Sequence, residues 1–217
     1  MFGVFGPLFI LPKGKQHGSF SISLFTQLYG LNLWRDIEIV IWRGNIWRRI
    51  DKMNVRHAMV DDAEELAHLI LQVEKEAEFM LFEAGERTLT PDLQRSQIEA
   101  MQNEENSTIL VAEADGKLVG YLVARGGRAR RNKHTVYIVI GVLASYRGKG
   151  IGTMLFAELE RWARTKGIHR LELTVVVNNQ RAVSLYRKMG FEREGIKRHS
   201  LLIHGQYIDE YYMAKLL

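Results

Sequence analysis

The stretch that most constrains this chain is residues 136–152, an apolar, β-branched run that ends in three glycines spaced two apart. A helical pattern follows at once, so the stretch predicts a strand, a glycine-rich turn and a helix. The first N–H groups of such a helix have no partner within it, and the helix dipole favours negative charge there. Arg147 and Lys149 add positive charge to the same turn. The stretch therefore predicts an anion-binding site.

The composition excludes several classes of protein and site. Hydrophobic residues make up 47% of the chain, which is enough for a real core and argues against global disorder. The chain has no cysteine, which removes disulfides, thiolate zinc sites and a cysteine nucleophile, and fits a reducing compartment. The apolar residues 1–11 have no basic residue before them and no small-residue cleavage site after them. A secretory signal is therefore not expected, and we expect a cytoplasmic location with no metal.

The net charge of +5 does not indicate nucleic-acid binding, because most of it lies at one end of the chain. Residues 1–52 hold seven Lys or Arg and three Asp or Glu, whereas residues 53–217 hold 23 and 22. The larger part is nearly neutral, so we expect no nucleic-acid partner. The arginine-rich segment 125–133 reads as a solvated hairpin tip; a guide for an acidic ligand is the second interpretation.

Residues 1–52 differ in composition from the rest of the chain. They hold three of the four tryptophans and show no sustained helical or strand period, although residues 37–42 favour a short strand. The uncharged run 18–34 is too short and too polar to span a membrane. One interpretation is an interfacial anchor or an oligomerisation arm. The amphipathic period of an anchor is missing, which favours an accessory extension with little defined structure.

From residue 53 on, the patterns predict a strand, two helices, three strands, a helix, a strand, a helix and two strands. Asp61 and Asp62 stand at the start of the first helix, which is expected to reach about residue 82, and Thr90 caps the second. Asp-Gly and His-Gly pairs predict two hairpins. The strands at 134–143 and 168–177 are apolar on both faces, so both faces should be covered. Gly141, inside the first of them, indicates a bulge or a close approach by a ligand.

The turn RGKGIG matches neither common nucleotide-binding fingerprint. A Walker turn needs GxxxxGK followed by Ser or Thr, and a dinucleotide fingerprint needs GxGxxG after the first strand of a domain. Here the spacing is GxGxG and the strand is the fourth. The turn still suits a pyrophosphate.

Two separated motifs resemble those of the GNAT superfamily of acyl-CoA-dependent N-acetyltransferases. The first is RGKGIG preceded by Val142, and the second is NQRAVSLYRKMGFEREG, which begins at Asn179. The resemblance covers about residues 54–217 and implies an N-acetyltransferase domain at 53–217, with residues 1–52 as an extension. It implies an α/β fold with a mixed, mostly antiparallel central sheet, helices on both faces and splayed central strands.

The resemblance also implies acetyl-CoA as co-substrate. The turn would hold its pyrophosphate, backbone groups of Ile140, Val142 and Leu143 would hold the pantetheine and acetyl groups, and Asn179 would bond to the arm. The N–H of Val142 would face the oxyanion. The implied cofactor-binding residues are Ile140, Val142, Leu143, Arg147, Gly148, Lys149, Gly150, Ile151, Gly152, Thr153 and Asn179.

The implied reaction is direct attack of an amine on the thioester, with Tyr186 at the position of the family's general acid. A helix face shared with other apolar residues would equally suit Tyr186 as a core residue. Many relatives carry a Glu on the strand before the turn, but this strand has no carboxylate, so the identity of the general base stays open. The candidates for the base or for substrate binding are a water wire and the residues Glu83, Glu86, His134 and Tyr137.

These observations leave several functions open. The first is an enzyme that acetylates the primary amine of a small molecule. The second acetylates a protein N-terminus, of the ribosomal-protein type. The third is a non-catalytic acyl-CoA-binding module, which the missing strand carboxylate favours, and the fourth is a nucleic-acid-binding protein. A homodimer stays open.

Overall fold

The computed structural model describes residues 42–43, 46–47 and 53–217. Two short strands, β1 (Trp42–Arg43) and β2 (Ile46–Trp47), form an antiparallel pair. The strand expected at 37–42 lies outside the described residues except for Trp42, and the extension expected at 1–52 stays a prediction. Residues 53–217 belong to a separate unit.

This unit contains the predicted elements in the predicted order. In chain order they are β3 (Met53–His57), η1 (Val60–Asp62), α2 (Ala63–Glu76), α3 (Pro91–Asn103), β4 (Thr108–Ala114), β5 (Lys117–Gly126), β6 (Thr135–Val142), η2 (Ala144–Tyr146), α4 (Ile151–Thr165), β7 (Arg170–Val176), α5 (Gln180–Lys188), β8 (Glu192–Ile203) and β9 (Gln206–Leu216).

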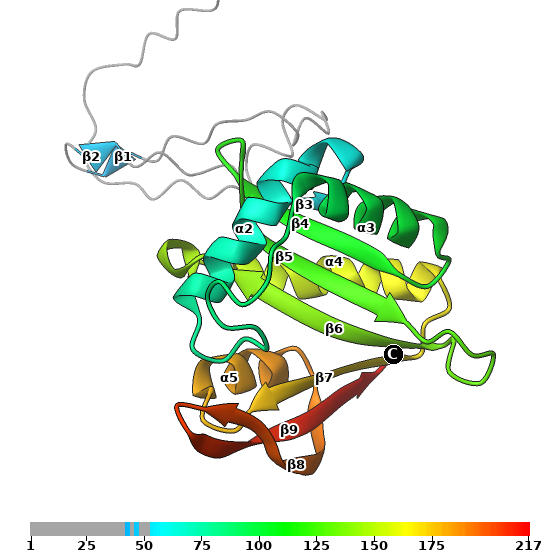
Figure 1. The fold of residues 1–217 in the computed structure, drawn as a ribbon. Coiled ribbons are helices and arrows are strands. Elements are labelled where there is room, and N and C mark those ends of the chain that lie inside the picture. The colour runs from blue at the N-terminus through cyan, green and yellow to red at the C-terminus, as the bar shows by residue number, and fades with distance from the viewer. Residues whose placement is uncertain (1–41, 44–45, 48–52) are drawn as a thin grey trace, which may run out of the picture. The chain divides into compact units, whose positions relative to one another are not determined.

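The seven strands of this unit form one sheet in the order β3-β4-β5-β6-β7-β9-β8. Neighbours are antiparallel except for β6 and β7, which are parallel. Figure 1 shows α2 and α3 on one face of the sheet and α4 on the other. The expected fold class, α/β with a mixed, mostly antiparallel sheet covered on both faces, is confirmed.

Each face of the sheet has its own core. Apolar residues of α2 recur at helical spacing, and Leu66, Ile70 and Val73 are almost fully buried against β4 and β5. The stripe of α4 contributes Leu155, Leu159 and others to the larger core on the opposite face. Burying these stripes on a shared sheet stabilises the layered arrangement.

Turn and cap chemistry behaves largely as the sequence predicts. Asp115-Gly116 and His204-Gly205 have positive φ at both positions, which fits two-residue hairpin turns. The Thr90 hydroxyl accepts a hydrogen bond from the Leu93 N–H at 3.2 Å and so caps α3.

The start of α2 differs in detail. Asp62 stands at the N-cap but makes no side-chain cap bond. Its carboxylate instead pairs with the Arg56 guanidinium at 2.6 and 2.8 Å and accepts the Met59 N–H at 2.6 Å. A charged partner within reach binds this carboxylate more strongly than a neutral amide.

The expected end of the first helix, near residue 82, is wrong. The helix ends at Glu76, and Ala77 has extended backbone. The Arg87 guanidinium donates hydrogen bonds to the buried Glu74 carboxylate and lies 4.3 Å from the Phe82 ring centroid. Because these contacts fold residues 77–90 back onto α2, the segment becomes a loop.

The expectation that both faces of β6 are covered is also wrong. Tyr137 and Val139 are each 40% exposed. They lie on the same face as Gly141, which Val73 of α2 covers, and α2 does not extend over them. One flank of β6 is therefore open to water.

Gly141 is required by packing and not by a bulge. The β5–β6 register runs without a shift from Gly120↔Val142 to Gly126↔Val136. A Cβ at Gly141 would lie 2.6 Å from Cε1 of Tyr121 and 2.8 Å from Cγ1 of Val73. The glycine makes room for the Tyr121 ring inside the core.

Candidate active site

The central feature of the site is the separation of β6 from β7. The two strands pair only from Thr135↔Arg170 to Tyr137↔Glu172. Strand β7 continues to pair with β9 as far as Val176, so it leaves β6 without losing its other neighbour. Figure 1 shows the two strands close at one end and apart at the other. The expected splay of the central strands is thus present.

Backbone hydrogen bonds decide which groups of β6 face this separation. Gly127 donates to the Thr135 carbonyl and Leu143 to the Val119 carbonyl, each at 3.0 Å. Because hydrogen-bonded pairs alternate along antiparallel strands, odd-numbered residues of β6 bond to β5. The N–H groups of Ile140 and Val142 therefore point towards β7, which no longer reaches them.

The three residues expected to hold the pantetheine arm differ in which of their backbone N–H and carbonyl groups lack a partner. Ile140 keeps both its N–H and its carbonyl, and Val142 keeps its N–H, whereas Nε of Arg147 donates to the Val142 carbonyl at 3.0 Å. Leu143 donates its N–H to β5 and accepts the Tyr146 N–H at 2.9 Å. Ile140 and Val142 therefore suit a ligand better than Leu143 does.

The turn after β6 leads into an uncapped helix. Gly148 and Gly150 have φ of 81° and 89°, a region that favours glycine, and Gly150 is the N-cap of α4 without a side chain to serve as a cap. The first bond of the helix runs from the Met154 N–H to the Gly150 carbonyl at 3.0 Å. The preceding N–H groups, those of Ile151, Gly152 and Thr153, are left for an anion.

The other residues of the turn, Arg147, Lys149 and Gly152, make different contacts. The Lys149 ammonium lies 4.5 Å from the Tyr146 ring centroid and is exposed, whereas the Arg147 side chain is partly directed inward by its bond to Val142. A Cβ at Gly152 would lie 2.7 Å from Cδ2 of Leu185, so this glycine allows α4 to approach α5. Lys149 is therefore the cation of this turn best placed to meet an anion.

Asn179 caps α5, since its Oδ1 accepts the Ala182 N–H at 3.2 Å. This bond uses the oxygen of the amide and leaves its NH₂ group as a donor. Asn179 follows the free end of β7, so it lies beyond the point where the strands separate.

Tyr186 lies in an aromatic cluster on the α4 side of the sheet. Its ring meets the Phe156 ring edge-on, with centroids 5.7 Å apart, and the Phe191 centroid lies 6.0 Å away. Only 8% of the residue is exposed. Burial, and to a lesser degree the nearby Tyr137 phenol, raises the pKa of Tyr186 above its usual range, so it stays a protonated donor.

The four residues expected near the base or the acceptor lie apart from one another. His134 precedes the paired end of β6, with its ring 6.4 Å from that of His169. It is eight positions from Val142 along the chain, about 26 Å of strand. Glu83 and Glu86 are exposed in the loop after α2, where the Glu86 carboxylate accepts the Glu83 N–H at 2.8 Å. Tyr137 alone stands where β6 and β7 separate.

Two residues at this site were not predicted from the sequence. The Thr174 hydroxyl of β7 is 2.9 Å from the Tyr137 hydroxyl. The Glu76 carboxylate accepts the Ala144 N–H at 2.7 Å, directly before the glycine turn. A polar residue at an alternate position of an apolar strand was a usable signal for Thr174. Glu76 had none, because its partner is 68 residues away.

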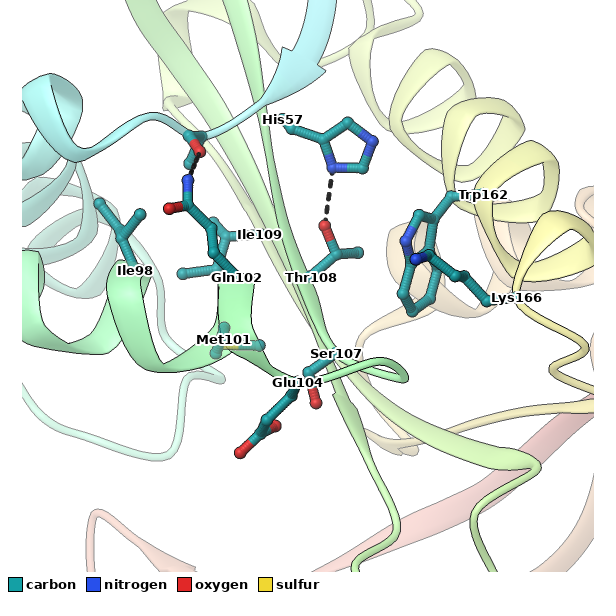
Figure 2. A pocket seen from close by; sticks show the side chains of 11 residues that line it. His57, Ile98, Met101, Gln102, Glu104, Ser107, Thr108, Ile109, Trp162 and Lys166 are labelled. Carbon is teal, nitrogen blue, oxygen red and sulfur yellow. Dashed lines mark hydrogen bonds between the residues drawn. The ribbon is translucent and has the colours of Figure 1, made fainter.

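Two hollows in the described part of the chain lie away from the separation of β6 and β7. A cavity of about 280 Å³ lies where the ends of β3 and β4 meet α3 and α4. Figure 2 shows side chains that line it, among them His57, whose ring nitrogen is 2.8 Å from the Thr108 hydroxyl. A more open hollow of about 640 Å³ lies between α2 and the loop at Gly85. Neither is lined by a residue expected to bind cofactor or acceptor. The described residues contain no cluster of side chains suited to a metal ion, and none of their helices has the length and apolar character to cross a bilayer.

Comparison with known proteins decides the family. A model of the acetyltransferase (GNAT) family matches residues 70–191, which spans strands β4 to β7 and the glycine turn. This chain belongs to the acetyltransferase (GNAT) family. It is therefore an acetyltransferase, and the resemblance seen in its two motifs is confirmed.

Among the relatives, an L-amino acid N-acetyltransferase, AaaT of Escherichia coli K12, is 36% identical over 111 residues, covering 49% of this chain and 67% of that protein. An N-alpha-acetyltransferase, RimI of Mycobacterium tuberculosis, is 37% identical over 105 residues, covering 48% and 63%. A crystal structure of a GNAT acetyltransferase from Streptococcus pneumoniae is similar with a TM-score of 0.74 and 30% identity, over 76% of this chain and 99% of that one.

Proposed function

We propose that this acetyltransferase moves an acetyl group from acetyl-CoA to the primary amine of a small molecule by direct attack. The observation that carries the proposal is the separation of β6 from β7, with the N–H groups of Ile140 and Val142 unpaired on one side. This separation leads directly to the uncapped N-terminus of α4. A pyrophosphate at α4 and an amide-bearing arm along β6 would satisfy both sets of donors.

The chain's own residues would contribute binding and polarisation. The N–H groups of Ile151, Gly152 and Thr153, with Lys149, would hold the pyrophosphate. The free N–H of Val142 or Ile140 would polarise the thioester carbonyl, since a fixed donor stabilises the negative charge that develops on its oxygen. The Asn179 NH₂ group would hold the arm from the β7 side.

In the reaction the amine nitrogen bonds to the carbonyl carbon, and the bond from that carbon to sulfur breaks. The amine proton leaves to water, because β6 carries no carboxylate and its flank at Tyr137 and Val139 is open. The departing thiolate takes a proton from Tyr186, which regains one from solvent. Its raised pKa keeps the Tyr186 phenol protonated beforehand.

The similarity to a relative named as an L-amino acid N-acetyltransferase supports a small acceptor. The similar identity to a relative named as an N-alpha-acetyltransferase supports the second candidate, acetylation of a protein N-terminus. Both relatives are matched over about two thirds of their length, so the acceptor is part of the proposal.

Two measurements test the proposal. Acetyl-CoA at saturation should raise the melting temperature, because a ligand of the folded state stabilises it by RT ln(1 + [L]/Kd). Thiol release should then appear with a panel of amino acids and polyamines and be weaker with peptides that copy ribosomal-protein N-termini. Faster release with the peptides would favour the second candidate. Stabilisation without release from any amine would favour a non-catalytic acyl-CoA-binding module.

A further inference from the structure

One side-chain hydrogen bond crosses from β6 to β7 at the point where the strands separate. The Tyr137 and Thr174 hydroxyl oxygens are 2.9 Å apart. The last backbone pair between the strands is Tyr137↔Glu172, so Thr174 lies two residues beyond it on β7. The bond therefore spans the narrow end of the separation after backbone pairing has stopped. We call this contact the Tyr137–Thr174 bridge.

Each residue of the bridge lies on a strand that is paired with a second neighbour. Thr174 pairs with Tyr212 of β9 inside an unbroken antiparallel register, and Tyr137 pairs with Arg125 of β5. Neither strand can move at the bridge without disturbing its other neighbour. The backbone positions that carry the two hydroxyls are therefore fixed by the sheet.

The opposite face of the sheet is closed at the same level. Ile138 and Leu173 directly follow the last paired residues of β6 and β7. They are 3% and 2% exposed and belong to the core beneath α4. The narrow end of the separation therefore has a polar bridge on one face and packed apolar side chains on the other. A group that enters from the wide end meets a closed end at this position.

The direction of entry follows from the position of the glycine turn. The turn lies after the carboxyl end of β6, next to Val142, and the bridge lies five residues earlier on the same strand. An arm anchored at the turn and bonded to Val142 and then Ile140 points its reactive end towards the bridge. An acyl group carried at that end would then lie between Ile140 and the bridge.

We propose that the Tyr137–Thr174 bridge measures the acyl group of the donor, so that an acetyl group fits and longer acyl groups are excluded. The inference rests on the proposed function and adds the donor specificity of the same site. A longer chain would have to break the Tyr137–Thr174 bond and push the two side chains apart, or press into the closely packed core beneath α4, where overpacking is unfavourable.

Tyr137→Phe and Thr174→Ala test the bridge in two ways. The first keeps the ring and removes the hydrogen bond, and the second also removes a methyl group from the closed end. Tyr212→Phe is the matched control, because Tyr212 is the exposed tyrosine directly across from Thr174 on β9. For each protein we would measure kcat/KM with acetyl-CoA and with butyryl-CoA, and the rise in melting temperature that each thioester produces.

The wild-type protein should strongly prefer acetyl-CoA in both measurements. The ratio of kcat/KM for butyryl-CoA to that for acetyl-CoA should rise about tenfold or more in Thr174→Ala and by less in Tyr137→Phe, and the control should keep the wild-type ratio. The difference between the melting temperatures measured with acetyl-CoA and with butyryl-CoA should shrink most in Thr174→Ala and less in Tyr137→Phe. This second readout requires binding alone.

Two results would overturn the inference while leaving the proposed function intact. One is a wild-type protein that uses butyryl-CoA as well as acetyl-CoA, and the other is an unchanged ratio in both bridge variants. A wild-type protein that neither binds acetyl-CoA nor releases thiol with any acceptor would overturn the proposed function itself, and the inference with it.

Discussion

The Glu76 carboxylate, at the last residue of α2, accepts the Ala144 N–H at 2.7 Å, and Gln72 supports it with a second bond at 2.7 Å. Ala144 opens the short η2 helix that leads into the glycine turn. The bond therefore ties the helix on one face of the sheet to the turn that would hold the cofactor, and it fixes the turn before any ligand arrives.

Glu76→Ala should weaken acetyl-CoA binding about tenfold, since a charge-assisted hydrogen bond that holds the turn is lost. Glu76→Gln should restore much of the affinity, because the amide oxygen can still accept the Ala144 N–H. Titration of the melting temperature with acetyl-CoA gives the Kd of each variant. Glu78→Ala, an equal loss of charge at an exposed position, is the control. Equal affinities of Glu76→Ala and wild type would refute this role.

Tyr186→Phe should lower kcat by about 10²-fold or more, the range of acid catalysis, while the Kd for acetyl-CoA stays near that of the wild type. Burial raises the pKa of Tyr186 above its usual range, so the neutral phenol persists as pH rises. We therefore expect no loss of kcat from its ionisation up to about pH 10, the pKa of an unperturbed tyrosine. Unchanged turnover in the variant would make Tyr186 a core residue only.

Gly141→Ala should destabilise the fold by about 1–3 kcal/mol, because the added methyl would overlap the Tyr121 ring and Val73 of α2. Gly195→Ala is the matched control, a strand glycine whose added Cβ meets nothing within 4 Å. That change should be neutral or slightly stabilising. Urea unfolding of both variants measures the difference, and similar stabilities would contradict the packing explanation for Gly141.

Because of the Asp62–Arg56 ion pair, we expect the free energy of unfolding to fall at acid pH. The hydrogen bond from Arg56 holds the pKa of Asp62 below its ordinary value of 3.8. A depressed pKa in the folded state stabilises the fold above pH 3.8, and the stabilisation is lost as pH falls through the folded-state pKa. Asp62→Asn should cost about 1 kcal/mol at pH 7, since the pair is partly open to water, and progressively less below pH 3.8.

The exposed neighbour Asp61 provides the control for that prediction. Asp61→Asn removes the same charge without touching Arg56. Denaturant unfolding at pH 7 and pH 3 compares the two variants, and a loss for Asp62→Asn that is the same at both values would rule out linkage to this carboxylate.

Much of the fold followed from local patterns. Helical spacing in α2 and α4, alternation in the strands and the Asp-Gly turn each depend on residues a few positions apart, so the order of elements was predictable. The end of α2 was missed because Arg87 reaches back to a buried carboxylate at Glu74, and no local pattern reports that contact. The prediction that both faces of β6 are covered was wrong because coverage depends on how far α2 extends over the sheet.

By itself, the sequence determined that a strand, a glycine turn and an uncapped helix follow one another, because those signals lie within 17 consecutive residues. Only the tertiary structure decided which backbone groups stay free and what closes the space beside them. Leu143 is bonded to β5 while Ile140 and Val142 are not, and the Tyr137–Thr174 bridge joins residues 37 positions apart. Such contacts depend on which strands become neighbours and where they separate, and that is settled by packing the whole sheet.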